Sequence, residues 1–274
     1  IYKVNNDSII IKNLLENGVV ENHKLFAINV LHDFYKNRDY QVAWMRKNNI
    51  DQALQAISDM HYDGLNPEDY HYSLLRDKAK QFSQTKTINS SEFAKFDILL
   101  SDAIITANMH LISGKVDPES LKRKWHVNEK NHKGRYAGEA KALEKALEQE
   151  NIVEEFNSLK PKHFMYTGLK KALTEYREYK DKGGWNPINS GETLKLNDKS
   201  IRVKQLRSRL LATNDMDKYK GANDSVYDAA LFEQVKRAQK KYGIHPDGNV
   251  GKETLKELNV SVEHRIEQIK ANLE

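Results

Sequence analysis

The chain contains no cysteine among its 274 residues. It therefore can form no disulfide, hold no cysteine-ligated zinc or iron–sulfur cluster, and offer no thiol nucleophile. Proline is also scarce, with 5 residues, and glycine numbers 13. Both counts fall below the usual shares of about 5% and about 7%. Because these two residue types interrupt helices, their scarcity over so long a chain favours many helices.

Long apolar runs are missing as well. No stretch approaches the roughly 18–20 consecutive apolar residues that a membrane-spanning helix needs, so we expect no transmembrane segment. Charged residues make up 30% of the chain, and the net charge is only +5. This composition is typical of a folded chain with a solvated surface rather than of a disordered one. The length allows one large domain or two ordinary ones.

Helical periodicity dominates residues 1–182. Apolar residues recur at helical spacing over 7–17, 23–37, 50–60, 92–113, 139–158 and 163–181. The clearest start signal is Asn66-Pro67, where an N-cap side chain precedes proline at the first helical position, and Asp117-Pro118 repeats it. No hairpin dipeptide separates alternating apolar runs in this region. We therefore expect residues 1–182 to form an all-α domain.

The composition changes at Gly183-Gly184, which Pro187 soon follows, and this marks a linker or domain boundary. Beyond it the pattern predicts three short helices, the first over 201–212 after the cap Ser200. Ser225 and Asp228 resemble a capping box for the second. The predicted fold class is therefore mainly all-α, with a multi-helix domain and a small three-helix module.

The small module carries most of the positive charge. Between residues 191 and 259 there are 14 Lys and Arg against 10 Asp and Glu, which accounts for +4 of the total +5. Such an excess indicates either an ordinary solvated basic surface or a partner that is an anionic polymer. The sequence leaves both interpretations open.

Metal and catalytic patterns are weak. The 10 histidines form no helical i, i+4 pair of the His-Glu-x-x-His kind. The loop Asp215–Gly221 partly matches the calcium-binding loop pattern, but it lacks an early oxygen ligand and its glycine comes one place late. No Gly-x-Ser-x-Gly elbow occurs, and adjacent acids such as Glu154-Glu155 do not face each other across a cleft. We predict no catalytic residue, no metal and no cofactor.

The run from Val203 to Leu258 resembles the type-1 peptidoglycan-binding domain, a three-helix module of bacterial wall enzymes. Its most specific part is the string Asp-Gly-x-Val-Gly-x-x-Thr-Leu, present in full at 247–255. The family usually has Phe before the Gln of its middle helix, where this chain has Ala238. The missing ring should either loosen the packing of the module or be offset by Phe232.

This resemblance implies that peptidoglycan (murein) is the partner. The candidate contact residues, expected on an exposed rim, are Tyr227, Gln239, Tyr242, Asp247 and Thr254. Structural roles for Tyr227 and Asp247, in helix packing and turn formation, are equally open.

A wider resemblance covers nearly the whole chain and points to the large periplasmic L,D-transpeptidases. The matching residues include Trp44, the run 63–70, the run 114–118, Trp125, Gly183-Gly184-Trp185 and, most strongly, the tail 258–274. In that family a helical scaffold, a peptidoglycan-binding module and a connecting helix precede a β-rich catalytic domain with a His and a nucleophilic Cys. The resemblance implies that this chain is the non-catalytic part. It would position a C-terminal catalytic domain on murein, in the periplasm or envelope of a bacterium.

The resemblance also gives the expected domain boundaries. We predict a helical scaffold domain at 1–182, a linker at 183–190, the peptidoglycan-binding module at 191–259 and a connecting helix at 260–274. That helix carries an apolar stripe, Val262, Ile266, Ile269 and Leu273, which needs a partner surface. We expect it to fold back on the scaffold domain, which would make the module an insertion; the alternative is a free, fraying chain end. No stop signal follows Leu273, so we expect the helix to be longer in the parent protein.

Two other functions compete. An accessory region of a lytic or other wall hydrolase is the first alternative. A helical nucleic-acid-binding module is the second, because several polar residues could project from a recognition helix: Lys236, Arg237, Gln239, Lys240 and Lys241. The string at 247–255 has no role in that reading, so we expect no nucleic acid.

Overall fold

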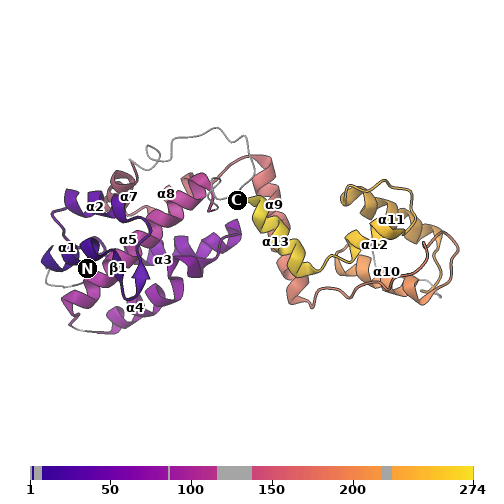
Figure 1. Ribbon diagram of the computed structural model, residues 1–274, viewed down its shortest axis with the longest axis horizontal. Helices are drawn as coiled ribbons and strands as arrows, with labels where there is room; N and C mark the ends of the chain where they lie inside the picture. Colours follow the sequence, from indigo (N-terminus) through magenta and orange to yellow (C-terminus); the bar gives the residue numbers. More distant parts are fainter. Residues whose placement is uncertain (1, 3–7, 86, 116–137, 217–223, 274) are drawn as a thin grey trace. The chain divides into compact units, whose positions relative to one another are not determined.

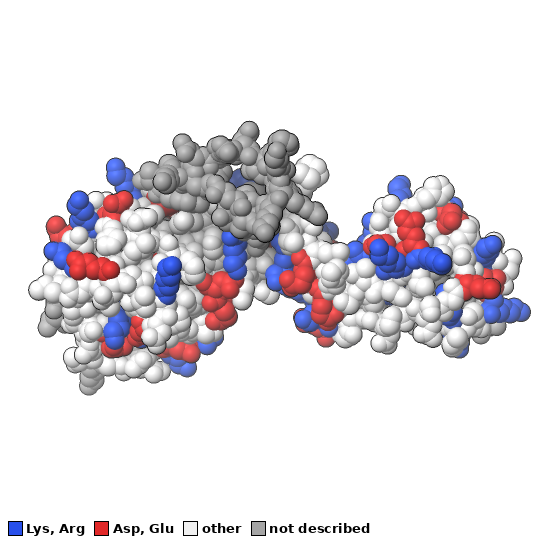
Figure 2. Space-filling model, in the orientation of Figure 1, with Lys and Arg blue, Asp and Glu red and all other residues white. Residues whose placement is uncertain are grey.

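The computed structural model describes residues 2, 8–85, 87–115, 138–216 and 224–273. It divides into two compact units, unit 1 with residues 1–167 and unit 2 with residues 168–273. Helices dominate both units (Figure 1), which confirms the all-α fold class. Lysine and arginine are interspersed with aspartate and glutamate over the face seen in Figure 2.

Unit 1 is a helical domain. Its helices are α1 (Ser8–Asn17), α2 (Ile28–Asn37), α3 (Lys47–Asp59), α4 (Tyr72–Gln84), α5 (Ser90–Ser113), α7 (Glu139–Gln149), α8 (Ile152–Ser158) and the start of α9 (Phe164–Asp181). Two 3-10 turns, η1 (Met60–Asp63) and η2 (Pro67–Tyr70), and a short antiparallel pair, β1 (Val19–Val20) with β2 (His23–Lys24), complete it.

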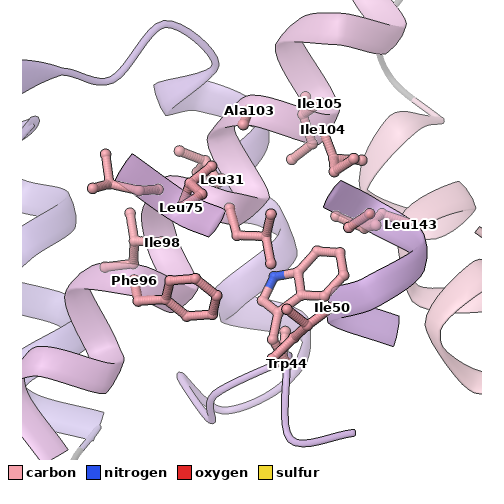
Figure 3. Packing of buried hydrophobic residues seen from close by; sticks show 14 of the residues in the cluster. Leu31, Trp44, Ile50, Leu75, Phe96, Ile98, Ala103, Ile104, Ile105 and Leu143 are labelled. Carbon is pink, nitrogen blue, oxygen red and sulfur yellow. The ribbon is translucent and has the colours of Figure 1, made fainter. Parts of the chain in front are cut away.

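Helix α5 runs through the middle of unit 1 (Figure 1). It is long and apolar enough to span a membrane, but 78% of its apolar 18-residue stretch is buried inside the protein, as in the core helix of a folded domain. Figure 3 shows Trp44 in the core of unit 1, and Ile50, Ile104 and Leu143 belong to the same buried apolar cluster. Trp44 is fully buried. The apolar residues within 92–113 therefore form part of the core of unit 1.

Two buried carboxylates of α5 fix neighbouring loops. Asp97 accepts hydrogen bonds from the amides of Ala43 at 2.9 Å and Trp44 at 2.8 Å. Asp102 accepts from the amide of Ala27 at 2.8 Å. Ala27 is the N-cap of α2 and has no capping side chain of its own, so Asp102 caps that helix from a distance. Burial raises the pKa of Asp97 and of Asp102 to about 6, against the opposing effect of these amides.

Two helix predictions in unit 1 are wrong in detail. The helix expected at 23–37 begins only at Ile28, because Glu21 and Asn22 both take positive φ and turn the chain into the β1–β2 hairpin. The helix expected at 139–158 is broken at Glu150, whose φ of 54° ends α7 before α8 begins. The cap at Asn66 is confirmed, since its side chain accepts from the amide of Glu68. The element that follows is the 3-10 turn η2.

Unit 2 contains the rest of α9 together with α10 (Ile201–Ala212), α11 (Ala229–Lys241), α12 (Lys252–Leu258) and α13 (Val262–Leu273). Helix α13 packs on α9 (Figure 1), through Val262 and Ile266 against Leu173, Tyr176 and Tyr179. The α9 residues in this contact belong to unit 2. Three expectations lie outside the described residues: the cap Asp117-Pro118, the match at Trp125, and residues 217–221 of the calcium-like loop.

Candidate functional site

The module of unit 2 is built on α10, α11 and α12. The core consists of buried apolar side chains from these helices and the segments beside them: Ile188, Leu194, Val203, Leu206, Leu210, Tyr227, Leu231, Val235, Ala238, Val250 and Leu258. Ser200 caps α10 by accepting from the amide of Arg202. Short backbone bridges, Leu194 with Val250 and Lys199 with Val226, tie the connecting segments together.

Gln239 organises the turn between α11 and α12. Its side chain is 1% exposed. Its amide nitrogen lies 2.8 Å from Asp247 Oδ1, 2.9 Å from the carbonyl of Asn249 and 3.1 Å from Thr254 Oγ1. Its amide oxygen accepts from the backbone N–H of Gly248 at 2.8 Å. A buried polar side chain with all of these partners fixes the turn in one conformation.

Gly248 is the position in this turn that only glycine suits. Its φ is +76°, and an added Cβ would lie 2.3 Å from the ring of Phe232. The hydroxyl of Tyr227 donates to the Gly248 carbonyl at 2.6 Å, and burial raises the pKa of this tyrosine. Phe232 therefore lies against the turn. It is only half-buried and does not fill a place in the centre of the module.

The expectation of an exposed rim is wrong for three of the five candidate residues. Tyr227, Gln239 and Thr254 are buried, because their polar atoms are needed inside the turn. Asp247 is exposed; the Asn249 backbone N–H, and then the Gln239 side chain, lower the pKa of its carboxyl. Tyr242 is half-buried and hydrogen bonds with Tyr176 of α9. Four of the five thus meet at one turn, and whether any of them touches a ligand stays a prediction.

The start of α11 differs from the predicted capping box. The N-cap is Asp228, whose Oδ1 accepts from the amide of Leu231 at 2.8 Å. Its Oδ2 accepts from Arg207 of α10 at 2.8 Å, and Arg207 also donates to the carbonyl of Val226. Because Arg207 is 3% exposed, this buried arginine ties α10 to the start of α11 rather than adding to the basic surface.

A second arginine of α10 joins the module to the α9–α13 pair. Arg209 is 1% exposed and lies over the ring of Trp185. Its Nε donates to the carbonyl of Leu258 at 2.6 Å, and the Trp185 indole donates to the carbonyl of Val260 at 3.0 Å. The sequence suggested Trp185 only through resemblance and did not suggest Arg209. The available signal was its position three residues after Leu206, on the apolar face of α10.

The segments that enter and leave the module are bonded to each other. The backbone N–H of Ile188 donates to Asn259 Oδ1 at 2.8 Å, and Asn259 Nδ2 donates back to the Ile188 carbonyl at 2.9 Å. Arg265 of α13 donates to the carboxylate of Glu257 at 2.7 Å. Within unit 2 the module is therefore held at both of its connections.

Histidines do not gather into a metal centre in the described part of the chain, where no group of three His, Cys, Asp or Glu could hold an ion. His23 and His71 come from different elements and their ring centres are 4.4 Å apart. Asp215, the first residue of the calcium-like loop, pairs with Lys241 at 2.8 Å. His23, His71 and Asp215 therefore contact other side chains of the protein.

The comparisons with known proteins agree with this architecture. Residues 29–173 match the family described as "Scaffold domain", which is more than half of the chain. The chain belongs to the Scaffold domain family. Residues 200–258 also match the family described as "Putative peptidoglycan binding domain". No curated protein matches the chain.

The two matches fit the elements closely. The Scaffold domain match runs from α2 into α9. The peptidoglycan-binding match begins at the α10 cap Ser200, ends with α12 and contains the turn held by Gln239. Both families are of non-catalytic kinds. A scaffold domain followed by a peptidoglycan-binding domain indicates a bacterial protein associated with the cell wall.

Proposed function

We propose that this chain is the non-catalytic scaffold and murein-binding region of an L,D-transpeptidase-like cell-wall protein, and that it positions a C-terminal catalytic domain on peptidoglycan. One observation carries the proposal. The string at 247–255, the most specific part of the peptidoglycan-binding resemblance, forms the turn around Gln239 inside the matched region. The link to L,D-transpeptidases comes from the resemblance of the tail and of the scaffold region, and a periplasmic location is proposed on the same resemblance.

The domain division stays part of the proposal. A scaffold domain at 1–182, a linker at 183–190 and a module at 191–259 put the two families in the order in which they match. The close bonding of Trp185, Ile188 and Asn259 supports a module inserted between α9 and α13. In that arrangement the module keeps a fixed orientation against the α9–α13 pair, and a scaffold requires such a fixed orientation.

Binding is tested by co-sedimentation of residues 1–274 with purified bacterial sacculi. We expect binding that is weak and partly reduced by salt, because the module carries +4 of net charge. The control is an unrelated helical protein of similar basic charge. Sedimentation no better than that control would refute murein binding.

Catalytic silence is tested separately with soluble murein tetrapeptides. We expect neither cross-linked nor hydrolysed product, because the chain has no cysteine and the sequence offers no nucleophile with a base. Turnover that persists through repurification and is lost when a His or Glu of this chain is replaced would contradict the proposal. It would favour a lytic enzyme instead.

A further inference from the structure

The burial of three candidate contact residues raises the question of which surface meets murein. Among the described residues of the module, two large apolar side chains are exposed, Leu196 at 41% and Ile201 at 64%. Both belong to the segment Lys195–Ile201, which we call the α10 approach segment. A single exposed aliphatic side chain is ordinary on a protein surface, but two within one seven-residue segment make that segment a candidate contact surface.

Two cations flank these aliphatic groups. Lys195 and Lys199 are exposed, and neither makes an ion pair within the described part of the chain. Four other charged side chains lie in this segment or close to it in the sequence. Lys204 forms an ion pair with Asp224 at 2.9 Å. Asp198 accepts a hydrogen bond from the backbone N–H of Lys195, Arg202 donates to the carbonyls of Asn189 and Glu192, and the side chain of Glu192 is exposed. Hydrogen bonds to neutral backbone groups do not cancel a charge, so Lys195, Lys199 and Arg202 stand against Asp198 and Glu192, and the local balance is a net positive charge of +1.

The α10 approach segment is held in place before any ligand arrives. Backbone hydrogen bonds join Asn197 to Tyr227 at 2.8 Å and Ser200 to Ser225 at 3.0 Å, and the Tyr227 amide donates to the carbonyl of Asp198 at 2.8 Å. Tyr227 in turn bonds to the turn at Gly248. A surface that is already ordered loses little conformational entropy on binding.

Murein offers two chemically different surfaces. Its glycan strands carry hydroxyl and acetamido groups, whereas its peptide stems carry alanine methyl groups and free carboxylates. Aliphatic side chains beside unpaired lysines complement the stems and not the strands.

We propose that the α10 approach segment is the surface through which the module binds the peptide stems of murein. Leu196 and Ile201 contact the methyl groups, and Lys195 and Lys199 contact the carboxylates. This inference rests on the murein binding proposed above. The buried residues Tyr227, Gln239 and Thr254 then act as positioning residues, because they hold the turn against which the segment is bonded.

The test uses the full chain and three variants: Leu196→Ser with Ile201→Ser, Lys195→Ala with Lys199→Ala, and the control Arg237→Ala with Lys240→Ala. The control removes two exposed cations of α11 in the same module. Sacculus binding is measured with each, with and without a soluble murein tetrapeptide or peptide-free glycan strands as competitor. All substituted side chains are exposed, and an unchanged melting temperature confirms that each variant folds.

We expect each approach-segment variant to bind sacculi about tenfold more weakly and the control within about twofold of the unchanged chain. The tetrapeptide should compete and the glycan strands should not. Unchanged binding by both approach-segment variants, or competition by glycan alone, would overturn this inference and leave murein binding intact. Failure of the unchanged chain to bind sacculi would overturn the proposed function as well.

Discussion

The guanidinium carbon of Arg209 lies 3.9 Å from the centre of the Trp185 ring. Arg209 belongs to α10 within the module, whereas Trp185 follows α9 directly, so this contact joins the module to the helix pair. Arg209 has no carboxylate partner in the described part of the chain. Its donors go instead to the Leu258 carbonyl and to Thr213. The aromatic ring is therefore a principal partner of a buried charge.

Replacing Trp185 with alanine should lower the free energy of unfolding of unit 2 by about 2–4 kcal/mol, since it removes the ring over Arg209 and a half-buried side chain. Trp185→Phe keeps a ring but loses the hydrogen bond to Val260, so it should cost only about 1 kcal/mol. Urea unfolding measures both variants. Equal losses would mean that the ring over Arg209 contributes nothing.

Gly248→Ala should destabilise unit 2 more than Gly243→Ala does. Both glycines have positive φ, +76° and +70°, so both substitutions carry a backbone strain of about 1–2 kcal/mol. Only at Gly248 does the new Cβ meet a side chain, Phe232, whereas the space at Gly243 is open. The added overpacking should cost about 1–3 kcal/mol more. Thermal unfolding of the two variants side by side checks this, and equal melting temperatures would contradict it.

Ile266→Ala tests the packing of α13 on α9. Ile266 is 7% exposed and lies against Leu173, Tyr176 and Tyr179, so the substitution should cost about 2–4 kcal/mol. His264→Ala, on the exposed side of the same helix, should change stability by less than about 0.5 kcal/mol. Chemical unfolding of the two variants side by side measures the difference. An equal loss in the free energy of unfolding in both variants would contradict the packing of α13 on α9 through Ile266.

Asp102 should give unit 1 a specific pH dependence. Burial raises the pKa of this carboxyl to about 6 from the ordinary value of 3.8. The folded state therefore binds a proton that the unfolded state does not bind between these two values. Wild-type stability should gain on the order of 2–3 kcal/mol from this group as the pH falls from 7 to about 4.

The variant Asp102→Asn isolates this effect, because other titrating groups cancel in the comparison. At pH 7 it should be less stable by about 1–2 kcal/mol, since its amide nitrogen would face the N–H of Phe26 or Ala27. The gap between wild type and variant should widen as the pH falls. Urea titrations at pH 7, 5.5 and 4 measure it, and a constant gap would show that Asp102 does not titrate in this range.

Local signals in the sequence predicted some elements closely. The helix predicted at 201–212 has those bounds as α10, because Ser200 supplies a cap next to it and the apolar residues keep a regular spacing. The long helix predicted at 92–113 begins only two residues earlier, where Asn89 is the cap. The β1–β2 hairpin was not predicted, because Glu21 and Asn22 take positive φ without a glycine.

The candidate site was harder to predict, and the reason is burial. The string at 247–255 correctly marked an important region. It could not distinguish a side chain that faces a ligand from one that, like Gln239, satisfies the backbone of a turn. The burial of Arg209 depends on Trp185, 24 positions earlier in the chain, so no local pattern reveals it. Contacts of this kind depend on the tertiary structure.

The reciprocal bonds between Ile188 and Asn259 also bear on the order of folding. These residues are 71 positions apart, so closing the chain between them costs roughly 4 kcal/mol of entropy when it is unfolded. Once the module has folded, its two ends are already adjacent and most of that cost has been met. Packing of helix α13 on α9 then costs little further chain entropy. The α9–α13 seam should therefore assemble last and open first.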